Sequence, residues 1–222
     1  MAMATVKDVS FRDLYHAPCI LGYSMANLLK AHEMTDLEIP AGADSVLAYP
    51  YIDHEGGLTF EVLAPADYCS ERYWLEDAPL EAANVRFLVR SEAVAEAPVK
   101  PCVDLAPVTL DFSSHMKMID EGYAAGADLL ATRRAREIDS LRNGDYPDDV
   151  LVTLVCSDDG SVREGVWIRL EKIDEEGMFE GTLLNQPYSE CGVNRGDLLQ
   201  IALVSVSDGS YKLASTPEML AG

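Results

Sequence analysis

The sequence lacks long apolar runs, and it is poor in positive charge. None of its hydrophobic stretches reaches the roughly 18 residues that a membrane-spanning helix requires. It has 17 lysine and arginine residues against 38 aspartate and glutamate residues, for a formal net charge of −21 over 222 residues. Such an excess of negative charge repels nucleic acids and anionic membranes and attracts basic proteins. We therefore expect no nucleic-acid partner and no membrane, although the same charge also serves plain solubility.

Signatures of metal, cofactor and redox chemistry are missing as well. There is no CxxC, HxH or HExxH pattern for a metal, and no GxGxxG or Walker sequence for a nucleotide cofactor. The first nine residues lack the basic start and apolar core of a signal peptide. The cysteines are odd in number and widely spread, which does not predict a disulfide framework; they are Cys19, Cys69, Cys102, Cys156 and Cys191. Together these features predict a protein of the reducing cytoplasm without metal or cofactor.

The first half of the chain combines strand and helix patterns. Alternating residues predict strands at 45–52 and 58–64, joined by the glycine-containing turn at 53–57, and a further strand at 85–90. A helix is expected to begin at Ser24, and residues 66–76 fit a second helix. We therefore predict an N-terminal α/β unit with an antiparallel sheet, forming a domain over residues 1–106.

A long helix is predicted over residues 114–143. Asn143 and Gly144 would end it in the manner of a left-handed C-cap. Its apolar residues recur at helical spacing; they are Met116, Ile119, Tyr123, Ala127, Leu130, Ile138 and Leu141. We expect this helix to connect the two halves and to belong to a second domain, residues 107–222.

The last third of the chain is a β region. Strands are predicted at 150–156, from Val166 onward, at 178–184 and at 198–204, with turns rich in glycine, asparagine and aspartate between them. Val166 and its neighbour Trp167 should lie on opposite faces of one strand. The overall prediction is an α+β protein that ends in an SH3-like small β-barrel or a curled antiparallel sheet.

Three segments of this β region carry a family resemblance. They are GVWI at 165–168, GTLLNQP at 181–187, and the glycines Gly192 and Gly196 followed by Asp197. Their arrangement resembles the YegJ-like bacterial domains of unknown function, over about residues 115–210 when the preceding helix is included. The resemblance implies a bacterial domain. It implies no activity, and no catalytic residue is carried over with it.

The loop at 185–195 is the best candidate for a functional surface. Four of its side chains suit recognition of a peptide or protein; they are Tyr188, Glu190, Asn194 and Arg195. The alternative is a purely structural loop in which proline and glycine set a tight path. The sequence defines no reaction, so we expect a non-enzymatic, cytoplasmic protein-binding module, of immunity or inhibitor type, with an acidic surface for a basic partner.

Two other functions fit the sequence. Gly22-Tyr23-Ser24-Met25-Ala26 is similar to the nucleophile elbow of serine hydrolases, with His115 as a possible base. Only about 20 residues precede this motif, whereas the elbow normally follows several parallel strands. An acidic structural subunit of an oligomer is the third possibility, and the sequence predicts no particular oligomeric state.

Overall fold

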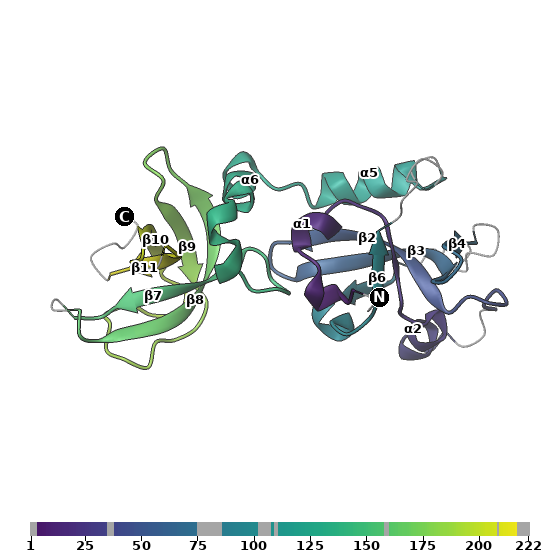
Figure 1. Ribbon diagram of the computed structural model, residues 1–222, viewed down its shortest axis with the longest axis horizontal. Coiled ribbons are helices and arrows are strands. Elements are labelled where there is room, and N and C mark those ends of the chain that lie inside the picture. The colour runs from purple at the N-terminus through teal and green to yellow at the C-terminus, as the bar shows by residue number, and fades with distance from the viewer. Residues whose placement is uncertain are drawn as a thin grey trace. The chain divides into compact units, whose positions relative to one another are not determined.

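The computed structural model describes residues 4–34, 38–74, 86–101, 108, 111–157, 160–207 and 209–216. The chain divides into two compact units, Met1–Ala124 and Ala125–Gly222 (Figure 1). The fold is α+β: the first unit contains an antiparallel sheet covered by short helices, and the second contains a closed five-stranded barrel. This confirms the predicted fold class.

The first unit is built on a sheet in the order β4-β3-β2-β1-β6, with β5 also paired to β3. Within the described residues, every strand pair of this sheet is antiparallel. The strands are β1 (Cys19–Leu21), β2 (Ser45–Asp53), β3 (Gly57–Asp67), β4 (Arg72–Tyr73), β5 (Leu88–Arg90) and β6 (Val99–Pro101). The predicted β2–β3 hairpin is confirmed, whereas the helix predicted at 66–76 is wrong over its described residues, which complete β3 and form β4.

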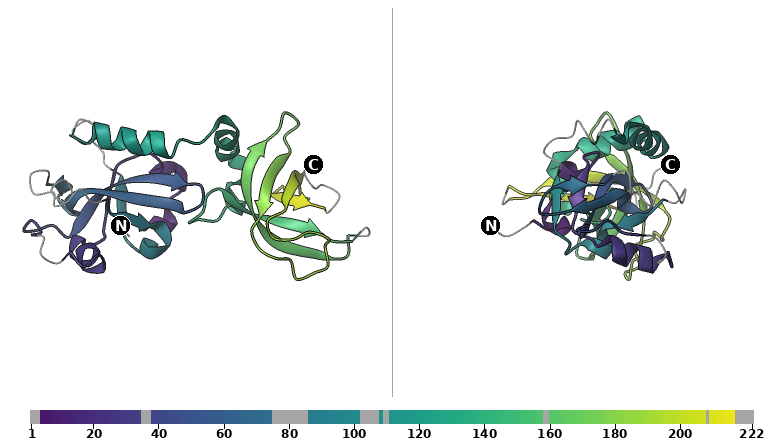
Figure 2. Two further views of the ribbon diagram at one scale, coloured as in Figure 1. Left: turned by 180° about the vertical axis from the view of Figure 1, so that it is seen from behind. Right: turned by 90° about the vertical axis from the view of Figure 1, so that its right-hand side faces the viewer.

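The two faces of this sheet bury different side chains, because neighbouring residues of a strand point to opposite sides. Val46 and Ala48 of β2 join a core with η1 (Val6–Asp8), α1 (Phe11–Leu14), α2 (Met25–Ala31) and η2 (Ser91–Val94). Leu47, Tyr49 and Tyr51 join another core with α5 (Ser113–Gly122). Helix α5 lies along the sheet of its own unit, as Figure 1 and the left view of Figure 2 show.

Polar contacts also hold α5 to the sheet. Glu61 of β3 is fully buried, and its carboxylate accepts hydrogen bonds from the guanidinium of Arg86 and from Nε2 of His115, the latter at 2.7 Å. Beyond His115 in the same helix, Asp120 accepts a hydrogen bond of 2.8 Å from the hydroxyl of Tyr49. Nδ1 of His16 lies 2.6 Å from the same carboxylate. Helix α5 is therefore joined to the unit by two histidine–carboxylate contacts.

The single long helix predicted over 114–143 is wrong. The structure has three shorter segments there: α5, which ends at Gly122, then α6 (Ala127–Arg134) and the 3-10 helix η3 (Arg136–Leu141). Glycines at 122 and 126 are unfavourable inside a helix and lie where the segments separate. The predicted apolar stripe is also divided: Met116 and Ile119 belong to a core of the first unit, whereas Ile138 belongs to the barrel core.

The second unit is a barrel in which each strand pairs with the next along the chain. The strands are β7 (Asp149–Val155), β8 (Arg163–Ile173), β9 (Phe179–Leu183), β10 (Leu198–Ser205) and β11 (Tyr211–Ser215), and the ring closes between β11 and β7. Strands that alternate in direction around a ring of five must leave one parallel pair, and this pair is β11–β7. The predicted small barrel is confirmed.

The barrel interior is filled by every second residue of its strands. Val166 is fully buried, and its neighbour Trp167 is 36% exposed, as their alternation predicted. Helix α6 is attached from outside by Arg133, which is buried and donates two hydrogen bonds, of 2.8 and 2.7 Å, to Asp148, the residue just before β7. Because the interior is packed with side chains, a partner or ligand of this unit meets its outer face or its loops.

Candidate protein-binding loop

The predicted loop follows β9 and begins by continuing the ladder of that strand. The N–H of Leu184 donates to the carbonyl of Trp167 at 2.9 Å. One residue later the side chain of Asn185 takes over, and its Oδ1 accepts the N–H of Trp167 at 2.7 Å. The amide side chain thus replaces a backbone carbonyl at the point where the chain leaves the sheet, shortly before Pro187, which has no N–H to donate.

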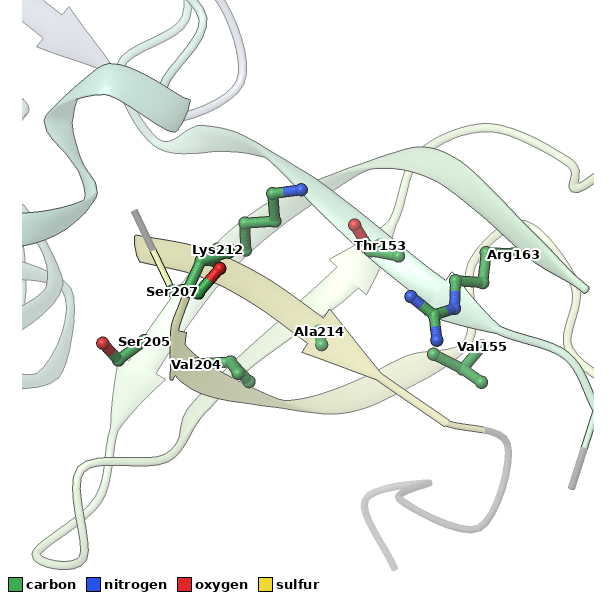
Figure 3. Close-up of a pocket in the computed structure, with 9 residues that line it drawn as sticks. Thr153, Val155, Arg163, Val204, Ser205, Ser207, Lys212 and Ala214 are labelled. Atoms are coloured by element: carbon green, nitrogen blue, oxygen red, sulfur yellow. The ribbon is translucent and has the colours of Figure 1, made fainter. Parts of the chain in front are cut away.

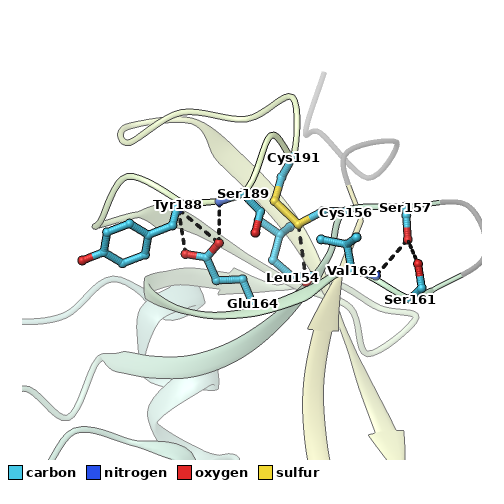
Figure 4. The surroundings of a disulfide bond; sticks show 9 residues. All are labelled: Leu154, Cys156, Ser157, Ser161, Val162, Glu164, Tyr188, Ser189 and Cys191. Carbon is cyan, nitrogen blue, oxygen red and sulfur yellow. Dashed lines mark hydrogen bonds between the residues drawn. A yellow bond between two sulfur atoms is a disulfide. The ribbon is translucent and has the colours of Figure 1, made fainter.

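Glu164, at the start of β8, fixes the middle of the loop. Its carboxylate accepts the N–H of Tyr188 at 2.9 and 3.1 Å and the N–H of Ser189 at 2.9 Å (Figure 4). These backbone hydrogen bonds, first that of Tyr188 and then that of Ser189, lower the pKa of Glu164, because they favour its charged form. One carboxylate therefore sets the backbone path at the tip of the loop.

A disulfide ties the loop to the barrel. Cys191 is bonded to Cys156, which follows β7, with a Cα–Cα distance of 4.4 Å (Figure 4). The prediction that the cysteines form no disulfide is therefore wrong. The two cysteines lie 35 residues apart in the chain, and this spacing alone does not predict a bond. They meet only because the barrel folds. Pro187 and Val193 are buried on either side of Cys191, and Val193 and Cys191 belong to the barrel core.

The far half of the loop is also held by hydrogen bonds. Asp197 accepts the N–H of Asn194 at 2.7 Å, and Oε1 of Gln186 accepts the N–H of Arg195 at 3.2 Å. Gly192 and Gly196 have φ of 71° and 96°, in the left-handed region that glycine adopts without strain. Glycine, proline and polar side chains thus set a tight backbone path through the loop.

All four predicted contact side chains lie on the outside of this fixed backbone. Tyr188 is 99% exposed, and Glu190, Asn194 and Arg195 are also exposed. Tyr188 points away from the disulfide and from Glu164 (Figure 4). Sequence reasoning missed Glu164 and Cys156, which hold the loop from outside it, because their partners in the loop lie 24 and 35 residues away in the chain.

The other sequence-derived candidates are not assembled into a site. Ser24 precedes α2 on one face of the first sheet, whereas His115 lies in α5 on the other face and contacts Glu61. Strand β1, which precedes Ser24, is antiparallel to both neighbours, unlike the sheet that carries a nucleophile elbow. Within the described residues no group of three or more metal-ligating side chains gathers.

Comparison of the chain with protein-family models, with curated proteins and with solved structures finds no match in any of the three. The resemblance to the YegJ-like domains stays a prediction. Among the described residues no helix is both long and apolar enough to cross a membrane.

Proposed function

We propose that this protein is a protein-binding module, and that the loop at 185–195 makes the specific contact with its partner. The observation that supports this most strongly is Tyr188. A tyrosine side chain that is 99% exposed leaves its aromatic ring in water, which is unfavourable for the free protein. Tyrosine and arginine are among the residues that contribute most to the energy of protein interfaces, and Arg195 lies on the same loop.

The fixed backbone supports the same proposal. A loop that is ordered before binding loses little conformational freedom on binding, so more of its contact energy appears as affinity. Glu164, the disulfide and the buried Pro187 and Val193 supply this order. We infer that the loop is a preformed surface that presents Tyr188.

The charge of the chain suggests the kind of partner. A net charge of −21 attracts a basic protein and accelerates its approach. This fits an immunity-type or inhibitory protein that covers a basic partner. In the alternative, an acidic subunit of an oligomer, the loop would contact another subunit of the same oligomer. Residence in the cytoplasm stays a prediction of the sequence, and the Cys156–Cys191 bond is the observation against it, since disulfides persist mainly in oxidising compartments.

The test compares three forms of the full chain in affinity capture from a lysate of its source cells. Tyr188→Ala should lose a partner that the wild type retains in stoichiometric amount. Tyr211→Ala, which removes another tyrosine exposed to 46% on β11, should retain it. The purified partner should then bind Tyr188→Ala at least tenfold more weakly than wild type. Equal binding by Tyr188→Ala and wild type would refute the loop as the contact site.

A further inference from the structure

The barrel has a groove on its outer face, and none of the residues that line it belongs to the loop at 185–195. Its volume is about 500 Å³, and it lies over β10, β11 and β7. Ala214 and Thr153 are register partners on the parallel β11–β7 pair and lie at its centre, between Lys212 and Arg163 (Figure 3). Val155 and Val204 add apolar surface, and Ser205 and Ser207 add hydroxyl groups.

The groove brings together two of the few basic side chains of this unit, Arg163 and Lys212. From Ala125 to Gly222 the sequence has 18 acidic and nine basic residues, so basic side chains are outnumbered. Four of the nine have a carboxylate partner within ion-pair distance, namely Arg133, Arg142, Arg169 and Lys172. Among the described residues, no ion pair satisfies Arg163 or Lys212; Arg163 donates one hydrogen bond, of 2.7 Å, to the carbonyl of Gly160.

The groove therefore combines positive charge, hydroxyl donors and an apolar surface. An oxyanion can be held by a guanidinium, an ammonium and hydroxyl groups together. The small side chains of Ala214 and Thr153 leave room for a ligand between the two cations, and Val155 and Val204 offer apolar surface to the rest of it (Figure 3). Nucleic acids are disfavoured by the surrounding negative charge, so a small anion suits this groove better than a polyanion.

We propose that this groove binds a small organic anion that joins a carboxylate or phosphate to a short apolar body. Arg163 and Lys212 bind the oxyanion from either side of Ala214 and Thr153, and Val155 and Val204 contact the apolar part (Figure 3). This inference goes beyond the proposed protein-binding function and does not depend on it, because the groove shares no residue with the loop.

The experiment titrates the isotopically labelled full chain with hexanoate and hexyl phosphate and follows its backbone amide signals. Inorganic phosphate tests the headgroup alone, and 1-hexanol tests the apolar body alone. Saturable shifts at Thr153, Ser205 and Ala214, with at least tenfold weaker binding of phosphate and hexanol, are expected. The tighter of the two amphiphiles identifies the headgroup. Shifts scattered over the surface, or equal binding of hexanol, would overturn the proposal.

Variants then test the residues. Arg163→Gln and Lys212→Gln should each weaken binding of the tighter amphiphile at least fivefold. Lys172→Gln removes the same charge from β8 outside the groove and should change affinity less than twofold. Ala214→Leu should fill the centre of the groove and abolish binding with the thermal midpoint preserved. Equal weakening by Lys172→Gln would mean that only the net charge matters, and the site assignment would be wrong.

Discussion

At the scale of single residues, the environment of Glu61 explains how a charge is tolerated inside the first unit. Burial is the largest influence on this side chain and raises its pKa. The hydrogen bonds from Arg86 and His115 act in the opposite direction, and together they hold the pKa of Glu61 below its ordinary value of 4.5. The charged form is thus favoured by the fold, because its partners outweigh the loss of water.

A carboxyl group with a lowered pKa makes stability depend on pH in a defined direction. Below the ordinary pKa the unfolded chain binds the proton more readily than the folded one. The contribution of Glu61 is therefore fully present above about pH 5 and is lost as pH falls through its folded pKa. Glu61→Gln should lower the free energy of unfolding at pH 7 by roughly 1–3 kcal/mol and should flatten the acid limb of the stability curve.

The measurement is urea unfolding at pH 7 and at pH 4, followed by the fluorescence or the amide signals of the first unit. Glu121→Gln is the control, because that glutamate lies exposed on α5 with only a surface ion pair to Lys117. A loss for Glu61→Gln that is as large at pH 4 as at pH 7 would contradict the assignment of the charged form.

At the scale of elements, α5 has one side in a core and one side in water. Ile119 is 1% exposed, whereas Met118, its neighbour in sequence, is 49% exposed. Ile119→Ala should cost roughly 2–5 kcal/mol, because it removes methyl groups from a packed site. Met118→Ala should cost less than about 0.5 kcal/mol. Chemical unfolding of both variants provides the measurement, and equal losses would mean that α5 is not packed as described.

Leu130 illustrates the consequence of the divided helix. As part of one long helix it was expected to be a core position, but in α6 it is only half-buried. The large loss expected for a fully packed leucine therefore does not apply to Leu130→Ala.

The disulfide acts on one element, the loop between β9 and β10. Cross-links across a segment of this length stabilise by about 3–4 kcal/mol in the chain-entropy model. Cys156→Ser together with Cys191→Ser should therefore lower the thermal midpoint of the barrel and leave that of the first unit unchanged. Reductant should reproduce the effect. Cys69→Ser, at an exposed free cysteine, should alter neither transition, and an unchanged barrel midpoint in the double variant would contradict this account.

Local sequence patterns predicted most strands of this protein but neither the barrel closure nor the division of the helix. Strands 45–52, 58–64, 150–156, 178–184 and 198–204 were located because alternation is a local pattern. The closing strand β11 was missed, since a stretch of five residues (YKLAS) has too little pattern of its own and becomes a strand by pairing with β7 and β10. The prediction of one long helix was wrong because helical periodicity does not reveal that Ile119 and Ile138 are buried in different cores. In the loop, exposed residues were predicted from composition, but Glu164 and the Cys156–Cys191 bond depend on contacts across the barrel.

At the scale of the whole molecule, charge should govern how fast a basic partner binds, and the loop should govern how long it stays. Exposed charges are screened beyond roughly 10 Å at 0.1 M salt, so the association rate should fall steeply as salt rises. Glu175→Gln with Glu176→Gln, in the exposed β8–β9 turn, should lower the association rate alone. Tyr188→Ala should instead raise the dissociation rate and keep the same salt dependence. Stopped-flow or surface-binding kinetics with the captured partner would separate the two, and an association rate insensitive to salt would exclude steering.

The parallel closure of the barrel has a mechanical consequence. Because β7 and β11 are neighbours that run in the same direction, the start of one and the end of the other lie at opposite ends of the barrel. A force applied through Asp149 and Ser215 therefore pulls along the β11–β7 ladder, and its hydrogen bonds bear the load together. A force through Asp149 and Ile173, at the same end of the antiparallel β7–β8 pair, opens the bonds one after another. Single-molecule stretching should thus require more force through Asp149 and Ser215 than through Asp149 and Ile173. The barrel should therefore resist a force applied at the two ends of its own chain better than a force applied across its first hairpin.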